Sequence, residues 1–522
     1  MNRIVVAGLC IATGIFGAFS MVKAQDRTPM EIRDIGSRRQ LFIDDYAIAR
    51  MANLKRSFHA CRKHPQPVIS PEHPWEGVGT APWPSTYLFG DAIWDAEKKL
   101  YRMWYTSATA NMEGGQHLTL YATSKDGIQW RKPLDLDIVQ YDGNGNNNIL
   151  IKGAAPLSVL RIDNAKDPEK RYRLLTFDRN VHAYAWRFSA DGLRWSEPVK
   201  IPDLQGKGMF DNLNVAYDRV AKRYVIAVKK FDNKYDHPVV GRLPGPGFRR
   251  WFMTTSKDGM ECTPLVEMPD LIDEIDKRLY IEGEGCGGLN TYGISMFAYH
   301  GVYIGMQWFF RVTDPEGFYN CHGGPMDGRL IFSRDPAGQW RIPTRKFVLP
   351  RGRKGQFDYG MICGIANRPV VSPDGTEWWY YYGGWEWGHG ISKRRARVGL
   401  AKFRVDGFAS VGSVDSEGFI ETPPLRFDGN ALALNVNATG QDTSGDKSYA
   451  RVELLDREGR VIPGFTKEDC DPIHDDAIDR IVTWNGDSDV SALADQVVRM
   501  RVYLKAAELY AFQFAGRDSF RK

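Results

Sequence analysis

The sequence is poor in the residue spacings that bind transition metals or form redox centres. It contains 7 cysteines and 10 histidines, and it has neither a Cys-x-x-Cys pair nor an HxH or HExxH pattern. Zinc sites and thiol-redox sites depend on such close spacing, so we expect neither. Calcium binds carboxylate oxygens and is compatible with this composition, but we predict no cofactor and no metal.

No apolar run after residue 24 approaches the ~20 residues that are needed to span a bilayer. The first 24 residues differ, because Arg3 gives a positive start, residues 4–21 are apolar, and a small-x-small cleavage pattern ends at Ala24. We therefore expect a bacterial signal peptide over 1–24, a secreted or periplasmic protein, and no membrane span after cleavage. An uncleaved anchor helix is the alternative.

The chain also lacks a strong net charge. The formal charge is +5 for the whole chain, and it falls to +3 once Arg3 and Lys23 are removed with the leader. The basic cluster at 393–397 is short and is interpreted as a solvated loop, so we expect no nucleic acid partner. Loss of Cys10 leaves an even number of cysteines, which permits disulfides in an exported protein without indicating how they pair.

Glycine and aromatic residues, in contrast, are abundant. The chain has 52 Gly, 15 Trp, 23 Tyr and 26 Phe, a composition that all-β proteins share with carbohydrate-handling proteins. A length of 522 residues indicates more than one domain. Internal repeats are therefore the first feature to look for.

The turn phrase Ser-x-Asp-Gly recurs through most of the chain. Clear copies begin at Ser124, Ser189 and Ser256, a variant begins at Ser333, and a degenerate copy spans 403–408. Asp and Gly suit a tight turn, since Gly tolerates positive φ and Asp accepts hydrogen bonds from nearby backbone amides. Because the phrase repeats, we expect its Asp residues, and the Trp that closes most copies, to be structural, with the Trp packed between neighbouring sheets.

A hairpin pattern precedes each of these phrases. It consists of an apolar run, a polar turn and a second, aromatic-rich run, which is typical of two antiparallel strands. The five copies lie within 92–105, 159–175, 215–227, 296–306 and 370–381. Each unit then holds about four strands, and five such units in series predict a five-bladed β-propeller over residues 76–410.

The pattern changes after residue 410. Residues 431–437, 449–455 and 497–503 alternate with period two and no Ser-x-Asp-Gly phrase occurs, which predicts a separate C-terminal β-sandwich over 411–522. Residues 25–75 form an N-terminal arm with one expected strand at 40–46. The arm is expected to complete a blade or to clamp the two domains.

Several short segments resemble a known family. They are LFIDDYAI at 41–48, MWYTS at 103–107, YATSKDG at 121–127, NVAYD at 214–218, FDYGMI at 357–362, YYGG at 381–384 and VTWNGDSDVSALA at 482–494. Together they resemble exported bacterial proteins similar to the N-terminal domain of glycoside hydrolase family 32. That group belongs to the five-bladed β-propeller glycosidases, which include family 43, so the resemblance implies a propeller and a glycosidase activity.

The resemblance does not carry over the catalytic triad of family 32. The sequence has no WMNDPNG-like segment, and its Arg334-Asp335-Pro336 triplet lies in a repeat turn, where a structural role is expected. The family does imply a third carboxylate that orients or tunes the proton donor.

Four acidic residues are the candidates for catalysis. Glycoside hydrolysis needs two carboxyl groups, one as proton donor and one as nucleophile or base. Inner strands of a propeller face its channel, so the candidates lie at or just before each hairpin, at Asp91, Asp211, Glu284 and Asp358. We assign Asp211 as base or nucleophile, Glu284 as donor and Asp358 as the orienting carboxylate; each could instead cap a turn or lie in a solvated loop. Asp327 is a further inner-rim position.

A sugar site also needs flat apolar faces and polar groups beside them. The candidates for substrate binding are Tyr87, Asn214, Tyr292, Trp385, Trp387 and His389, with Trp83 and His322 as further positions. The segment 385–389 could equally be a packed loop between blades.

The sequence therefore predicts an exported glycoside hydrolase that cleaves an oligo- or polysaccharide with carboxylates at the propeller channel. A non-catalytic glycan-binding propeller is the first alternative, since the recognised triad motifs are missing. A polysaccharide lyase that uses His389 or a tyrosine as base is the second. The sugar, the linkage and the stereochemical outcome do not follow from the sequence.

Overall fold

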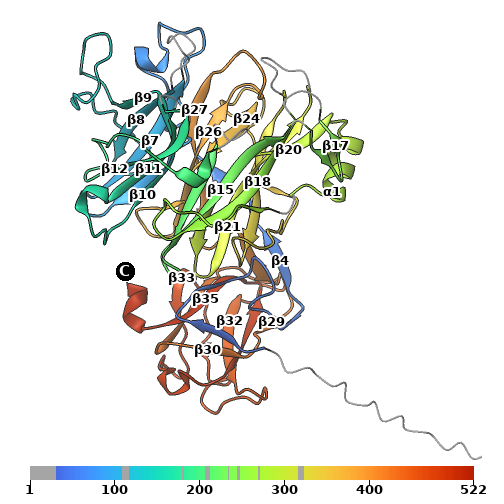
Figure 1. Cartoon of the computed structure of the whole chain (residues 1–522). Helices are drawn as coiled ribbons and strands as arrows, with labels where there is room; N and C mark the ends of the chain where they lie inside the picture. The colour runs from blue at the N-terminus through green and yellow to red at the C-terminus, as the bar shows by residue number, and fades with distance from the viewer. Residues whose placement is uncertain are drawn as a thin grey trace, which may run out of the picture.

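The computed structural model describes residues 31–108, 117–178, 181–205, 212–232, 234–243, 247–268, 271–314 and 322–521. Within these ranges the regular secondary structure is almost entirely β-strand (Figure 1), which confirms the all-β class. Residues 1–24 lie outside them, so the signal peptide and secretion stay predictions. None of the helices in the described ranges has the length and hydropathy of a membrane span.

Helical segments are short. The α-helical turn α1 (Glu274–Asp276) continues into the π-helical segment η4 (Lys277–Gly283). The described 3-10 turns are η1 (Pro74–Glu76), η2 (Pro168–Lys170), η3 (Pro202–Leu204), η6 (Ser491–Leu493) and η7 (Arg517–Arg521). These segments connect strands and form no helical layer.

Four four-stranded antiparallel sheets follow one another along the chain, and a five-stranded sheet follows them and includes one strand from the N-terminal arm. The first holds β6 (Ala92–Asp95), β7 (Leu100–Ala108), β8 (His117–Ser124) and β9 (Ile149–Lys152), and the second holds β10 (Ala154–Arg161), β11 (Tyr172–Asp178), β12 (Ala183–Ser189) and β13 (Val199–Lys200). The third holds β14 (Leu213–Asp218), β15 (Arg223–Asp232), β18 (Phe248–Ser256) and β19 (Val266–Glu267), and the fourth holds β20 (Gly288–Tyr299), β21 (Val302–Val312), β22 (Met326–Ser333) and β23 (Phe347–Leu349). The fifth holds β24 (Met361–Ile365), β26 (Glu377–Trp385), β27 (Ala396–Arg404) and β5 (Arg62–Lys63), with β25 (Val370–Val371) paired to β26. A separate short hairpin joins β16 (Asp236–His237) to β17 (Gly241–Arg242).

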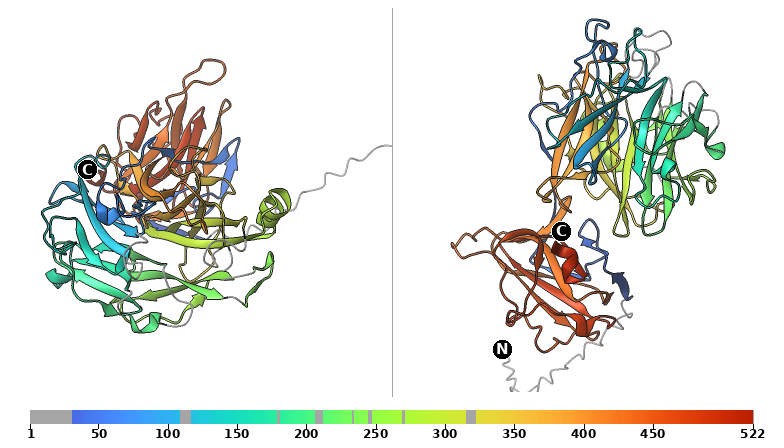
Figure 2. Two further views of the ribbon diagram at one scale, coloured as in Figure 1. Left: turned by 90° about the horizontal axis from the view of Figure 1, so that it is seen from above. Right: turned by 90° about the vertical axis from the view of Figure 1, so that its left-hand side faces the viewer.

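The five sheets contact one another in order and return to the first. Strand β10 lies against β7 and β8, β14 lies against β10 and β20, and β24 lies against β20 and β22. Strand β25 then contacts β6. Figures 1 and 2 show the sheets side by side around this ring, with the C-terminal sheets (red) at one end of it. We call the end where β14, β20 and β24 begin the upper end, and the end beside the C-terminal sheets the lower end, as in Figure 1.

The Ser-x-Asp-Gly phrase forms the turn that locks one sheet to the next. In the first copy, the Asp126 carboxylate accepts hydrogen bonds from two backbone N–H groups, at 2.9 and 2.8 Å, and Gly127 adopts a φ of 72°. The Tyr381 hydroxyl of the fifth sheet donates to the Gly127 carbonyl at 2.6 Å. The Trp104 and Trp186 indoles likewise donate to turn carbonyls of the next sheet, both at 2.8 Å. The three clear copies of the phrase thus each receive a hydrogen bond from an aromatic side chain of a neighbouring sheet.

The N-terminal arm pairs with both parts of the molecule. Strand β5 forms the outer edge of the fifth sheet beside β27. The strands β1 (Arg33–Gly36), β2 (Gln40–Leu41), β3 (Arg50–Ala52) and β4 (Lys55–Phe58) pair with β30, β35, β29 and β28 of the C-terminal region. The strand expected over 40–46 is only two residues long, because the chain turns at Asp44. The Asp44 carboxylate accepts a hydrogen bond from the Tyr46 backbone N–H and forms an ion pair with Arg334.

The C-terminal residues form two larger sheets around one apolar cluster, and β30 pairs with β1 in a separate two-stranded sheet. Their strands are β28 (Ala409–Gly412), β29 (Gly418–Glu421), β30 (Leu425–Phe427), β31 (Ala431–Asn437), β32 (Tyr449–Leu455), β33 (Asp476–Ile481), β34 (Arg499–Lys505) and β35 (Glu508–Ala515). One sheet runs β33-β31-β35-β28-β4, and the other runs β3-β29-β34-β32. Leu434 and Phe512 from the first sheet and Val452 and Val502 from the second are fully buried in the shared cluster. This region has its own core, separate from those of the five sheets.

The described cysteines form no disulfide. Cys61, Cys262, Cys286, Cys363 and Cys470 are all free thiols, and Cys321 lies outside the described residues. Burial raises the pKa of Cys61 to about 12, so its thiol is a poor nucleophile. Covalent crosslinks between described residues therefore contribute nothing to this fold.

Candidate functional site

Aromatic side chains from three sheets meet at the upper end of the ring. The Tyr87 ring lies 5.0 Å from the Trp385 ring and 5.0 Å from the Phe89 ring. Phe89 stacks on Trp308 at 6.0 Å, and Trp308 stacks on Tyr292 at 6.2 Å. We call Tyr87, Phe89, Tyr292, Trp308 and Trp385 the aromatic cluster.

His389 extends this cluster. Its ring lies 4.9 Å from Tyr292, and its Nδ1 lies 2.6 Å from the His322 carbonyl. Four of the residues predicted to bind substrate, Tyr87, Tyr292, Trp385 and His389, are therefore gathered at one place. Tyr292 lies in β20, the first strand of its sheet, whereas Trp385 ends β26 and His389 follows it.

Two buried cations lie against the same cluster. The Lys229 ammonium is 5.0 Å and the Arg249 guanidinium 4.5 Å from the centre of the Tyr292 ring. Neither position was predicted from the sequence, because the search for a hydrolytic site followed carboxylates. The signal that could have found them is a pair of basic residues, Lys229 and Arg249, on paired strands that are otherwise rich in apolar residues.

Some buried donors at this end lack acceptors. The Trp385 Nε1, the Asn212 Nδ2 and the Arg249 Nε and Nη1 atoms are buried without a hydrogen-bond partner among the described residues. Buried polar groups in folded proteins are almost always paired, so each exception needs a partner such as water or a ligand. These donors make the upper end chemically suited to oxygen-rich ligands.

Asp358 lies at the beginning of the fifth sheet and is almost fully buried, with 2% of its surface exposed. Its carboxylate forms an ion pair with Lys63 of strand β5 at 2.6 Å and accepts a hydrogen bond from the Tyr382 hydroxyl at 2.8 Å. Burial, together with the Asp358 charge, raises the pKa of Tyr382 well above its usual range. The carboxylate is therefore held firmly in one position.

Glu284 follows the π-helical segment η4 and is the most exposed of the described candidates, with 49% of its side chain exposed. It pairs with Arg311 at 2.8 Å, and Arg311 also pairs with Asp327 at 2.6 Å. Asp327 in turn accepts from Arg351, whose guanidinium donates to the carbonyl of residue 359. A chain of charged contacts thus connects Glu284 to the neighbour of Asp358, and the inner-rim candidate Asp327 lies in its middle.

Asp91 accepts four hydrogen bonds inside the ring. The donors are the Ser158 hydroxyl at 3.0 Å, the Val159 backbone at 2.9 Å, and the backbone and amide of Asn367 at 2.8 and 3.2 Å. The Asn214 side-chain amide donates to the side-chain oxygen of Asn367, Oδ1, at 2.6 Å. Asp91 and Asn214 therefore belong to one network that joins the first, second, third and fifth sheets.

Trp387 lies in a second, smaller aromatic group. Its ring packs edge-on against Trp83 at 5.0 Å, and the Lys393 ammonium lies 5.5 Å from the Trp387 ring. Arg397 pairs with Glu386 at 2.8 Å. The basic cluster at 393–397 was interpreted as a solvated loop. Two of its side chains instead contact this segment, since Lys393 lies over the Trp387 ring and Arg397 pairs with Glu386.

Asp211 lies outside the described residues, so its role stays a prediction. It directly precedes Asn212, which is buried, and strand β14 begins one residue later. Among the described residues, no group of three His, Cys, Asp or Glu side chains could hold a metal ion.

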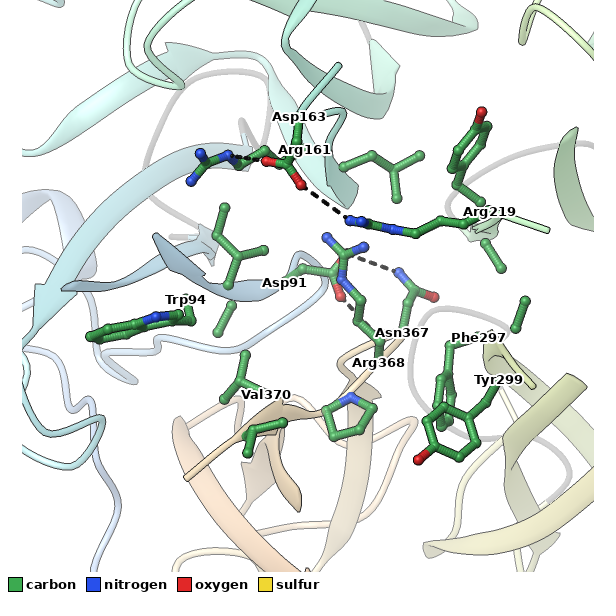
Figure 3. Close-up of a pocket in the computed structure, with 18 of the residues that line it drawn as sticks. Asp91, Trp94, Arg161, Asp163, Arg219, Phe297, Tyr299, Asn367, Arg368 and Val370 are labelled. Atoms are coloured by element: carbon green, nitrogen blue, oxygen red, sulfur yellow. Dashed lines mark hydrogen bonds and ion pairs between the residues drawn. The ribbon is translucent and has the colours of Figure 1, made fainter. Parts of the chain in front are cut away.

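A cavity of about 1110 Å³ lies at the lower end, and the hairpin turns of the five sheets contribute to its walls. Figure 3 shows Asp91 and Asn367 at its inner side and Arg161, Asp163 and Arg219 along one edge. Of the residues predicted for catalysis or binding, Asp91 alone lines this cavity within the described part of the chain. The other described candidates lie elsewhere.

No protein-family model and no curated protein matches the chain. Among solved structures, a thermostable family-43 glycoside hydrolase is 17% identical over 62% of this chain and 90% of its own, with a TM-score of 0.39. The catalytic domain of a GH62 α-L-arabinofuranosidase from Coprinopsis cinerea is 12% identical over 67% and 98%, with a TM-score of 0.40. An N-acetylgalactosamine deacetylase from F. plautii is 13% identical over 73% and 96%, with a TM-score of 0.38.

Proposed function

We propose that the protein is a glycoside hydrolase built on a five-bladed β-propeller and a C-terminal β-sandwich. The five repeated units and the ring of five sheets, four with four strands and one with five, support the propeller. The observation that carries the function is the aromatic cluster at the upper end with its unpartnered donors. Flat rings pack on the apolar faces of sugars, and sugar hydroxyls supply the acceptors that these donors lack.

In this proposal Glu284 donates the proton, Asp211 acts as base or nucleophile, and Asp358 orients the site. Glu284 is exposed enough to meet a substrate, whereas Asp358 is fixed by Lys63 and Tyr382 and acts through position and charge. Asp91 is completely occupied by its four hydrogen bonds, so we give it a positioning role. Tyr87, Tyr292, Trp385, Trp387 and His389 are the proposed contacts to sugar, and Asn214 acts through Asn367.

The test is a screen of the purified protein against oligo- and polysaccharides of diverse composition. For a glycan that is cleaved, we expect Glu284→Gln and Asp211→Asn each to lower turnover by about 10²–10⁴-fold, the usual contribution of an acid or base group. Glu282→Gln is the matched control, since Glu282 is exposed in the same helical segment, and it is expected to leave turnover unchanged. Unchanged turnover in both Glu284→Gln and Asp211→Asn refutes the assignment.

A glycan-binding protein without turnover is the second candidate. One observation favours it. The exposed candidate Glu284 is already paired with Arg311, and the buried candidate Asp358 with Lys63. Retention on a polysaccharide with no release of reducing sugar, at any enzyme concentration, would support binding and reject hydrolysis. Release of reducing sugar that depends on Glu284 would do the reverse.

A further inference from the structure

Two neighbouring arginines on β18 have opposite surroundings. Arg250 is partly exposed and pairs with Asp232 at 3.0 Å and with Glu267. Arg249 has only 6% of its surface exposed, and no carboxylate among the described residues pairs with it. Its Nε and Nη1 atoms are buried without a hydrogen-bond partner in the described part of the chain.

The surroundings of Arg249 are aromatic and positively charged. Its guanidinium lies 4.5 Å from the Tyr292 ring centre, 4.9 Å from that of Phe231 and 5.7 Å from that of Phe310. The Lys229 ammonium lies over the same Tyr292 ring, and Lys229 is fully buried. Cation–π contacts offset part of the hydration free energy that the guanidinium loses on burial. A buried guanidinium with unpaired donors still carries a desolvation cost.

Arg249 also lines a cavity of about 310 Å³ between the third and fourth sheets. Asn290 and Thr291 of β20 line the same cavity, and the Asn290 side chain accepts a hydrogen bond from the Arg249 backbone at 3.2 Å. A space of this size is at the lower end of the range of ligand pockets. It therefore offers room for about one sugar unit.

We infer that the glycan bound at the upper end is acidic, and that a carboxylate or sulfate group on one of its sugar rings binds the Arg249 guanidinium. A planar guanidinium presents parallel donors that match the oxygens of either group, and such charge-assisted bonds are the strongest in proteins. An anion at this position supplies the acceptors that the buried Arg249 donors lack. This inference rests on the proposed glycan site and adds the chemical class of its ligand.

The test measures binding and needs no turnover. The full chain is titrated calorimetrically with glucuronate, glucose 6-sulfate and glucose at low ionic strength, and the unmodified protein is compared with Arg249→Gln, Arg249→Lys and Arg194→Gln. We expect the acidic sugars to bind at least 10-fold more tightly than glucose, and the affinity to fall as salt is added. Arg249→Gln is expected to weaken acidic-sugar binding by about 10- to 100-fold, and Arg249→Lys to weaken it less. Arg194→Gln is the control, since Arg194 is exposed and lies outside this cavity, and it is expected to leave the affinity unchanged.

A preference for only one acidic sugar identifies the anionic group as carboxylate or sulfate. Equal affinity for glucose and both acidic sugars, or no binding of either acidic sugar, overturns the inference even if Arg249→Gln does not fold. Unchanged affinity in a folded Arg249→Gln variant also overturns it and assigns Arg249 to ring stacking alone. Acidic-sugar binding without cleavage of any glycan keeps the inference and rejects hydrolysis, so the two proposals fail separately.

Discussion

At the scale of single residues, Asp91 is a carboxylate whose two oxygens are both occupied by donors from the protein itself. Its Oδ1 accepts from the Asn367 backbone, and its Oδ2 accepts from the Val159 backbone, the Ser158 hydroxyl and the Asn367 amide. Both oxygens thus face backbone N–H donors in a fully buried position. A carboxylate is the one side chain of this size that can accept on both sides.

Asp91→Asn is therefore expected to destabilise the protein. An amide carries one oxygen, so in either orientation its NH2 group points at a backbone N–H and leaves a buried donor unpaired. We expect the free energy of unfolding to fall by about 3 kcal/mol, measured by urea denaturation. Asp163→Asn, at an exposed acid of the lower cavity, is the control and is expected to stay within about 0.5 kcal/mol of the unmodified protein. A fully stable Asp91→Asn protein that has lost turnover would instead place Asp91 among the catalytic residues.

At the scale of elements, the Ser-x-Asp-Gly turns combine a local and a long-range function. Gly192 adopts a φ of 73°, and a Cβ there would lie 2.9 Å from the Trp104 ring of the preceding sheet. Gly143 adopts a similar φ of 75°, but nothing lies within 4 Å of its Cβ position. The two glycines therefore separate the cost of the backbone conformation from the cost of disturbing the contact between sheets.

We expect Gly143→Ala to cost about 1 kcal/mol, the penalty of a left-handed backbone for a residue with a Cβ. Gly192→Ala is expected to cost about 2–4 kcal/mol, because the methyl group also displaces Trp104 from the turn carbonyl to which it donates. Thermal or chemical unfolding of both variants checks the difference. Equal destabilisation of the two would mean that the Trp104 contact does not lock the sheets together.

The same turns explain how much of the molecule the sequence predicts. The Ser124–Asp126–Gly127 contacts join residues at most three positions apart, so they leave a pattern in the sequence, and the hairpins before them do so too. The site depends on contacts between distant residues instead. Lys63 meets Asp358 across most of the chain and Arg311 links Glu284 to Asp327. No local sequence pattern indicates such pairs. The sequence therefore predicts the acidic candidates but not the basic residues that pair with them.

Arg249 was missed for a related reason. Its surroundings come from β15, β18, β20 and β21, and only their assembly shows that the guanidinium has ring contacts and no acidic partner in the described part of the chain. Tyr87 and Trp385, in contrast, were both predicted as substrate contacts, and their rings lie 5.0 Å apart. Whether they contact substrate stays a prediction.

At the scale of the whole molecule, Asp406 connects the arm, the ring and the C-terminal sheets. It follows β27 and accepts from Arg39 of the arm at 2.8 Å, from Tyr299 of the fourth sheet at 2.7 Å and from Asn435 of β31 at 3.0 Å. Burial and the Asp406 charge raise the pKa of Tyr299 well above its usual range. One carboxylate thus fixes three parts of the chain to one another.

Asp406→Asn removes the charge at this joint while keeping a residue that tolerates its positive φ of 61°. Because Arg39 is then left buried with one fewer counter-charge, we expect about 3 kcal/mol of destabilisation. We further expect calorimetry to resolve separate unfolding transitions for the ring and the C-terminal sheets. Asp479→Asn is the control, since Asp479 pairs with the same arginine but is partly exposed. A single unshifted transition in Asp406→Asn would contradict this view of the joint.

Strand β5 has a consequence for the order in which the ring assembles. It lies near the beginning of the chain, but it pairs with Lys402 and Ala401 near the end of the ring. During synthesis this segment emerges first and must wait unpaired until the fifth sheet exists, and Asp358 has no counter-charge until then. Closing so long a loop is slow, and meanwhile β27 presents an open edge to other chains. The residues of β5, which are synthesised before the ring, thus complete its last sheet, and their pairing covers the open edge of β27.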